Sequence, residues 1–548
     1  MQTVETTDLP RRVRLQRPTL AWRPDTALLW IVGGSVALLV LLPLLYLLMR
    51  AAGAEATGWQ NLFRWRTVQT LSNTLGLAAA VTGLSTLIAV PIAWLTVRTD
   101  LPFRRLWTIL APLPLVIPSY VGAYLIASAL GPRGLLQQIL GAFWEIERLP
   151  SFYGFFGALF TLTVLSYPYL LLSVRAALLR LDPALEEASR SLGKNGWQTF
   201  FGVTLPLLRP ALGVGGLLVA LYTLRDFGAV ALMRYDTFTR AIYIQYQSFD
   251  RAQAALVALV LVAVTFIFVA FEARMQRRAS FVQGHTGALR PPTKIALGIW
   301  RWPAVLFCAL VVTLSLILPA SVLIYWLIRG LIAGESVRGL DQATWNSVLA
   351  SVLAAVATIL AALPLAILTV RHDNRWSQLL GRLTYTAYAL PGIVIALSLV
   401  FLGANHLPWL YQTLAMLTIS YTILFVPQAM GTLRTTLLQI PPSLEEAARS
   451  LGRGPLRTFW TITLPLLRPG LLAGASMVFL TAMKELPATL LLAPIGFKTL
   501  ATAVWSSVSE AYFAAAAAPA LLIVLLSSLP MTIFILREQG HDQDYRSM

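Results

Sequence analysis

The chain has 548 residues, of which 57% are hydrophobic and 12% charged, with a formal net charge of +18. A composition this apolar excludes a soluble globular protein of this length and indicates a protein that crosses a membrane many times. The basic balance by itself would suit a nucleic-acid-binding protein, but the cationic residues flank apolar runs instead of forming one basic patch, so we exclude that class.

Twelve apolar runs are long enough to span a bilayer, for which about 20 residues are needed. The predicted spans are 27–49, 68–97, 106–130, 152–179, 203–233, 252–273, 303–328, 343–370, 384–403, 408–433, 464–493 and 512–536. The fold class predicted is therefore an all-α polytopic membrane protein. Because six spans per half restore the orientation of the chain, the two halves should be parallel repeats related by an axis along the membrane normal.

Matched residues show that the second half repeats the first. Asn73 and Asn346 are 273 residues apart, as are Pro118 and Pro391, whereas Pro206 and Pro465 are 259 apart. The first half therefore carries 14 extra residues, which we assign to the loop at 131–150. The predicted segments are a basic tail (1–26), a first half (27–274) with a polar loop at 182–201, a linker (275–302), a second half (303–536) with a matching loop at 441–460, and a C-terminal tail (537–548).

The Lys and Arg residues are concentrated on alternate loops. They precede the first span and follow the second, fourth and sixth: Arg11, Arg12, Arg14, Arg17, Arg98, Arg104, Arg105, Arg190, Lys194, Arg274, Arg277 and Arg278. Positive charge marks the cytoplasmic side of membrane proteins, so both termini and the loops 182–201 and 441–460 are predicted to be cytoplasmic. Prolines inside the spans predict kinks at Pro91, Pro118, Pro168, Pro364, Pro391 and Pro427.

The segment 185–193 (Leu-Glu-Glu-Ala-Ser-Arg-Ser-Leu-Gly) returns as Leu-Glu-Glu-Ala-Ala-Arg-Ser-Leu-Gly at 444–452. Each copy follows a proline suited to the first position of a helix, Pro183 or Pro442, and ends at a glycine suited to helix termination. Leucine and alanine recur on one face, which predicts a short exposed amphipathic helix that can lie in a groove of a partner.

These two copies, each followed by a Leu-Pro and a further proline, resemble the coupling-loop motif of membrane subunits of ATP-binding-cassette (ABC) importers. The resemblance implies the type I importer fold and docking of each loop on an ATP-hydrolysing subunit, hence two copies of that subunit. The residues that it assigns to ATPase coupling are Glu187, Ala188, Gly193, Glu446, Ala447 and Gly452.

Two basic–acidic pairs lie at the same depth in the predicted spans, Arg225–Asp226 and Lys484–Glu485. Charges at this depth are costly and usually line a translocation path or pair with one another, and we keep both readings. Asp226 and Glu485 are the candidate ligands for a transported metal ion, because carboxylate oxygens suit hard cations. Tyr235, Tyr243 and Tyr246 are weaker candidates, better explained as interface aromatics.

The residues around these pairs, including Asp226-Phe-Gly-Ala and Glu485-Leu-Pro-Ala, look like those of fused permeases of ferric-iron importers. That resemblance covers the whole chain and implies a periplasmic ferric-binding protein as donor and a bacterial inner-membrane location. Fused thiamine permeases and polyamine permeases share parts of the pattern and remain alternatives. A secondary transporter driven by an ion gradient is a further alternative, which the two coupling loops oppose.

The sequence lacks a phosphate-binding loop, because Asn195 follows Gly193–Lys194 and alanine stands at 188. We therefore expect no enzyme activity, with ATP and Mg²⁺ used by the partner subunit. Four scattered histidines and the lone Cys308 give no metal-ligand spacing, so no cofactor is expected to be bound by this chain.

Overall fold

A computed structural model of the chain describes residues 24–144, 147–248, 251–282, 294–334, 339–372 and 374–528. These residues form helices and their connections, with a single isolated β-bridge between Thr99 and Ile295. The N-terminal tail, except for its last three residues at the start of α1, the C-terminal tail and residues 283–293 of the linker lie outside the described residues.

The helices of the first half are α1 (Pro24–Ala52), α2 (Ala56–Leu62), α3 (Trp65–Arg98), α4 (Arg104–Leu110), η1 (Leu113–Val116), α5 (Ser119–Leu130), α6 (Leu135–Trp144), α7 (Phe155–Arg180), α8 (Pro183–Ser191), α9 (Gly196–Thr199), η2 (Phe200–Thr204), α10 (Leu205–Arg225), α11 (Gly228–Leu232), α12 (Phe238–Gln247) and α13 (Arg251–Val282). Those that follow are η3 (Gly298–Trp300), α14 (Arg301–Val312), η4 (Thr313–Ile317), α15 (Leu318–Ile332), α16 (Leu340–Arg371), α17 (Arg375–Tyr385), η5 (Thr386–Ala389), α18 (Gly392–His406), α19 (Leu414–Gln439), α20 (Pro442–Ser450), α21 (Pro455–Thr458), η6 (Phe459–Thr463), α22 (Leu464–Met483), α23 (Pro487–Leu492) and α24 (Leu500–Ser509).

Nine helices of the described part are long and apolar enough to cross a membrane, and two further pairs, bent by 100° and 102°, raise the number to 11. A shorter apolar helix, Phe513–Ser528, covers the described part of the twelfth predicted span. The all-α fold with two repeated halves is confirmed, whereas the number of twelve spans stays a prediction.

Four predicted spans are interrupted in the structure, two of them at prolines for which a kink was predicted. The predicted spans 106–130 and 384–403 break just before α5 and α18, where Pro118 and Pro391 adopt extended backbone with ψ of 147° and 146°. The predicted spans 203–233 and 464–493 break at Asp226 and at 484–486, between α10 and α11 and between α22 and α23. Pro91, Pro168, Pro364 and Pro427, in contrast, lie inside unbroken helices.

Each half has a core of three spans. Helices α3, α7 and α10 contact one another in the first half, and their counterparts α16, α19 and α22 do so in the second. Leu162 and Val174 of α7 and Leu365 of α16 are fully buried in these cores.

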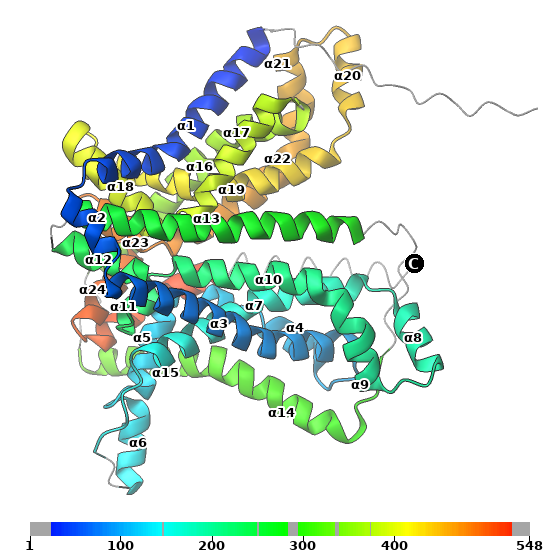
Figure 1. Cartoon of the computed structure of the whole chain (residues 1–548), viewed down its shortest axis with the longest axis vertical. Helices are drawn as coiled ribbons and strands as arrows, with labels where there is room; N and C mark the ends of the chain where they lie inside the picture. Colours follow the sequence, from blue (N-terminus) through cyan, green and yellow to red (C-terminus); the bar gives the residue numbers. More distant parts are fainter. Residues whose placement is uncertain are drawn as a thin grey trace, which may run out of the picture.

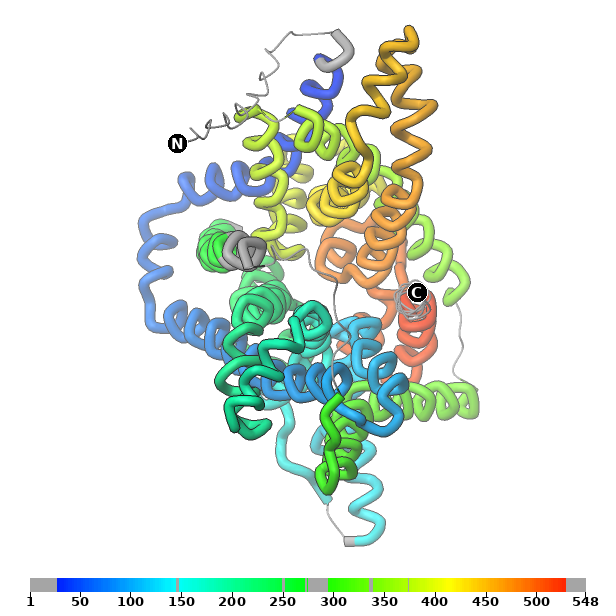
Figure 2. Tube along the Cα trace, turned by 90° about the vertical axis from the view of Figure 1, so that its right-hand side faces the viewer, coloured from blue at the N-terminus to red at the C-terminus, as the bar shows by residue number. Residues whose placement is uncertain are grey.

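The first span of each half packs on the other half. Helix α1 contacts α16, α17 and α18, and Figure 1 shows it in blue above the second half. In the same way α15 contacts α5 and α14 contacts α3, so the first span of the second half lies against the first half. Figure 2 shows this crossover from a second direction. The exchange joins the halves through two large apolar helices.

Candidate functional site: two coupling helices and a ring of helix breaks

The two repeated segments form short helices, α8 and α20, at the right-hand side of Figure 1, away from α2, α6, α12 and α24. Pro183 and Pro442 occupy the first helical turn as predicted, and the Asp182 carboxylate accepts a hydrogen bond of 3.0 Å from the Ala184 N–H. Gly193 and Gly452 have φ of 81° and 79°, a left-handed conformation that side chains with a Cβ rarely adopt. Glycine is therefore required to turn the chain at both sites.

All six residues assigned to ATPase coupling are exposed. Glu187, Ala188 and Gly193 stand free of the helices behind α8, and Glu446, Ala447 and Gly452 do the same on α20. The structure thus places them where another protein could reach them.

Four apolar positions around each coupling helix are also exposed, and they match across the halves at the same 259-residue spacing. The pairs are Leu185 and Leu444 (50% and 44% exposed), Leu192 and Leu451 (80% and 82%), Trp197 and Leu456 (71% and 71%), and Phe201 and Trp460 (59% and 60%). We call these eight residues the coupling faces. The motif predicted only the leucines, and the last two pairs lie beyond it. The sequence feature that could have identified these two pairs is that large apolar residues recur 259 positions apart in loops that are otherwise polar.

The acidic residue preceding each predicted coupling glutamate is buried and holds the helix in place. The Glu445 carboxylate on α20 accepts hydrogen bonds of 3.2 and 3.0 Å from Nε and Nη2 of Arg371, the last residue of α16. The same Arg371 Nη2 donates to the Ile440 carbonyl at 3.1 Å. One guanidinium therefore binds both the Ile440 carbonyl, just before α20, and the Glu445 carboxylate on α20. This geometry fixes α20 relative to the end of α16.

The first half repeats this contact with a longer distance. Arg98, the last residue of α3, lies 3.8 Å from the Glu186 carboxylate and donates to the Leu181 carbonyl at 3.0 Å. Arg98 is completely buried, as is nearly all of Glu186. We call Arg98 with Glu186, and Arg371 with Glu445, the coupling clamps. Sequence reasoning missed them, although identical residues at matched positions were the available signal.

A π-helical turn follows each coupling loop and supplies one more contact to the clamp. These turns are η2 and η6, and a wide turn of this kind often marks a functional position. The Thr204 hydroxyl donates to the Glu186 carboxylate at 2.9 Å, and the Thr463 hydroxyl donates to Glu445 at 3.3 Å. Each coupling helix is thereby linked to two spans of its half.

The intramembrane acids lie at helix breaks and bind backbone N–H groups. Asp226 accepts from Ala229 at 2.9 Å and from Val230 at 3.3 Å, at the start of α11. Glu485 accepts from Ala488 at 3.2 Å, at the start of α23. The breaks before α5 and α18 adjoin them, since Ser119 lies beside Asp226 and a Cβ on Gly392 would meet a Glu485 oxygen at 2.6 Å.

The basic members of the pairs turn away from their acidic neighbours. The Lys484 ammonium donates to the Leu115 carbonyl of the other half at 3.1 Å, and Arg225 interacts electrostatically with Glu485 across the halves. No ion pair within 4.0 Å joins these four described residues. The Lys484 ammonium thus contacts the backbone of the other half, and both readings of the charged residues, as the lining of a path or as a structural interface, stay predictions.

The candidate metal ligands do not gather into a closed metal site. Among the described residues no three His, Cys, Asp or Glu side chains lie close enough to hold an ion together. The Tyr243 ring packs on Phe227 and the Tyr235 ring on Phe155, as expected of structural aromatics. The arrangement is better suited to making polar contacts with a passing cation than to holding a metal ion permanently.

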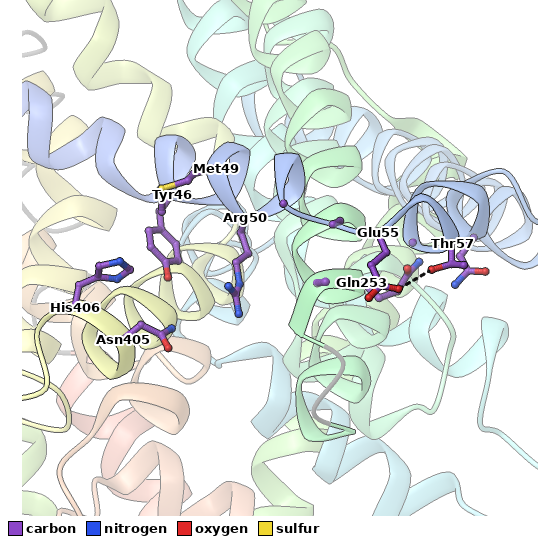
Figure 3. A pocket seen from close by; sticks show the side chains of 13 residues that line it. Tyr46, Met49, Arg50, Glu55, Thr57, Gln253, Asn405 and His406 are labelled. Carbon is purple, nitrogen blue, oxygen red and sulfur yellow. Dashed lines mark hydrogen bonds between the residues drawn. The ribbon is translucent and has the colours of Figure 1, made fainter.

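A cavity of about 760 Å³ opens at the end opposite the coupling helices (Figure 3). It lies between the end of α1, α2, the start of α13 and the end of α18, so both halves line it. Arg50 lies over the Phe401 ring at 5.9 Å, and His406 stands edge-on to Tyr46 at 5.8 Å. The cavity is mainly polar and joins the two halves at this end.

Repeated halves, broken central helices and two matched short helices with exposed apolar faces are features of a membrane-spanning transporter subunit. The chain belongs to the family described as binding-protein-dependent transport system inner membrane component, whose model matches residues 84–281 and 359–537. The two matched regions confirm that one chain carries both permease halves.

Two relatives matched over most of this chain are named as ferric-iron permeases. The chain is 37% identical to the Fe(3+)-transport system permease protein FbpB 2 of Haemophilus influenzae, over 92% of this chain and 96% of the relative. It is 27% identical to the ferric transport system permease protein FbpB of Actinobacillus pleuropneumoniae, over 84% and 70%. The molybdenum transport system permease protein ModB of Escherichia coli is 36% identical, over 28% of this chain. The resemblance to fused ferric permeases is confirmed.

Proposed function

We propose that the chain imports ferric iron, delivered by a periplasmic ferric-binding protein, with energy from two copies of a separate ABC ATPase. The observation that carries this proposal is the pair of coupling faces, which repeat four apolar positions and one exposed glutamate on each half. Two equal docking surfaces suit two equal ATPase subunits. The names of two relatives matched over most of this chain support ferric iron as the substrate.

The proposed orientation places the coupling helices and both termini in the cytoplasm of a bacterium, with the chain in the inner membrane. Support comes from the charges, because Arg98, Arg104, Arg105, Arg190 and Lys194 lie at the coupling end. ATP and Mg²⁺ would then be bound by the ATPase and no cofactor by this chain. The cavity beside Arg50 would face the periplasm, where the donor protein docks.

In this scheme ATP-driven closure of the two ATPase subunits moves α8 and α20, and the clamps carry that motion into α3 and α16. Those helices belong to the three-span core of each half, whose third members, α10 and α22, end at the intramembrane charges. Displacing the cores would open and close the path at the four helix breaks. This is a two-state change of access, consistent with packed helices moving as bodies.

The test is uptake of radioactive ferric iron by proteoliposomes that contain this chain, its ATPase and a periplasmic ferric-binding protein. We expect uptake that requires both ATP and the loaded binding protein. Thiamine, a polyamine and molybdate serve as competing substrates in matched assays. Uptake of one of these compounds without iron uptake would refute ferric iron as the substrate. Iron uptake driven by an ion gradient in the absence of the ATPase would refute ATP hydrolysis as the energy source.

Replacing Asp226 by Asn together with Glu485 by Gln should reduce iron uptake at least about tenfold while leaving the complex assembled. The amides can still accept the N–H bonds that start α11 and α23, so the helix breaks persist, whereas the negative charge is lost. A charge at about 4 Å contributes several kcal/mol to attraction of a cation at intermediate dielectric. Uptake assays with Asp236→Asn, an exposed acid of the same half, provide the control. Unchanged iron flux in the double variant would remove these acids from the path.

A further inference from the structure

The first half carries a helix for which the second half has no counterpart. This is α6, in the stretch between α5 and α7, whereas a short turn joins α18 to α19. The stretch is the site of the 14-residue difference between the halves inferred from the spacing of matched residues. The helix is therefore an addition to the common permease plan, and the coupling mechanism does not use it.

Helix α6 has one apolar side and one polar side. At 100° per residue, its leucines at 135, 136 and 140 with Ile139 and Phe143 fall on one half of the circumference, and Gln137, Gln138 and Gly141 fall on the other. Leu135 packs against the core, at the edge of the apolar side. The middle of that side is exposed: Leu136 is 39%, Ile139 58% and Phe143 75% accessible.

The direction of α6 differs from that of the spans. In Figure 1 the spans of the first half run from right to left, whereas α6 runs downward, across them, at the end opposite α8. Figure 2 also shows it in cyan, projecting beyond the bundle. A helix at the end of the spans and perpendicular to them lies parallel to the membrane plane.

We propose that α6 is an interfacial helix, with its apolar side buried among lipid chains at the edge of the bilayer and its glutamines in the headgroup layer. Helix α15, which contacts α5, also exposes large apolar side chains, since Ile328 is 52% and Leu331 59% accessible, as expected of a span next to lipid. Arg133, exposed just before α6, would lie among phosphate groups. Short helices with this division of side chains bind membrane surfaces in this way.

The contact of α6 with lipid would affect transport, because α6 is joined to α5. The helix follows directly on α5, whose first residue, Ser119, lies beside Asp226 at the helix break. Anchoring α6 in the interface holds the far end of α5 at a fixed depth. The second half has no such anchor after α18, so the two halves differ in how firmly their broken helices are held.

Spin labelling of the full chain in nanodiscs tests this proposal. Cys308 is the chain's one cysteine, so Cys308→Ala allows single labels at Ile139→Cys and, on the opposite side of α6, at Gln138→Cys. Leu136→Cys is a second apolar-side position, in case Ile139→Cys does not fold. We expect a several-fold higher ratio of collisions with oxygen to collisions with a water-soluble nickel chelate at 139 and 136 than at 138.

Equal exposure of all three labels to the nickel chelate would show that α6 stands in water and would overturn the proposal. Protection of the apolar-side labels from both reagents would show a protein cover and overturn it equally. That the occupied leaflet is the outer one rests on the proposed orientation. A membrane-impermeant thiol reagent that modifies Gln138→Cys only from the cytoplasmic side would refute the orientation while leaving the interfacial contact intact.

Discussion

Charge reversal on both coupling faces, Glu187→Arg with Glu446→Arg, is expected to abolish ATP-dependent uptake and to stop the ATPase from co-purifying with the chain. Both glutamates are exposed and make no contact that holds α8 or α20, so the fold should persist. At the centre of a docked interface, a misplaced charge costs several kcal/mol, which corresponds to a loss of binding of about 100-fold or more. Affinity purification with a tagged ATPase measures it directly.

The matched control for this double variant is Glu510→Arg, which reverses an exposed charge just after α24, at the other end of the molecule. It should leave ATPase binding and uptake unchanged. The single variants should weaken binding less than the double, because each removes one of two equal contacts. If the double variant still binds the ATPase with wild-type affinity, the coupling faces do not form the docking surface.

Local sequence information was sufficient to predict the coupling helices. Proline at the start, glycine at a left-handed turn and an apolar repeat act within a few residues, and the structure has α8 and α20 where those signals place them. The clamps required more, because Arg371 and Glu445 are 74 residues apart and meet only when α16, α19 and α20 are folded together. An identical residue at the equivalent position of both halves shows that the position is constrained, but it does not show which other residue that side chain contacts.

The breaks at Asp226 and at 484–486 and the exchanged first spans were beyond the reach of sequence patterns. Kinks were predicted at Pro91 and Pro118 alike, yet Pro91 lies inside α3, and only Pro118 marks a break, at the start of α5. The local chemistry of a proline does not show whether neighbouring segments can accommodate the freed backbone groups. Helix α1 is apolar on every side, so its composition carries no information on which half it contacts. Its position against α16 and α18 follows from packing with a distant part of the chain.

Cutting the clamp of the second half with Arg371→Ala is expected to separate ATP hydrolysis from transport. The substitution leaves Glu445, 13% exposed, without its guanidinium partner, and removing one member of a largely buried pair costs about 3–5 kcal/mol. Helix α20 then loses its fixed position relative to α16, whereas Glu446 and Leu451 on the coupling face remain. The ATPase should therefore still bind and hydrolyse ATP, while uptake falls at least about tenfold.

The ratio of ions transported to ATP hydrolysed, measured in proteoliposomes, distinguishes this loss from simple instability. Arg371→Lys should retain part of the coupling, because an ammonium can satisfy one of the two acceptors, the Glu445 carboxylate or the Ile440 carbonyl, but not hold both. Arg98→Ala should reduce the ratio less, since Arg98 lies 3.8 Å from Glu186, against 3.0 Å for Arg371 and Glu445. An Arg371→Ala complex with a normal ratio would mean that motion reaches the spans through η6 and α22 alone, and the clamp would then be only a structural contact.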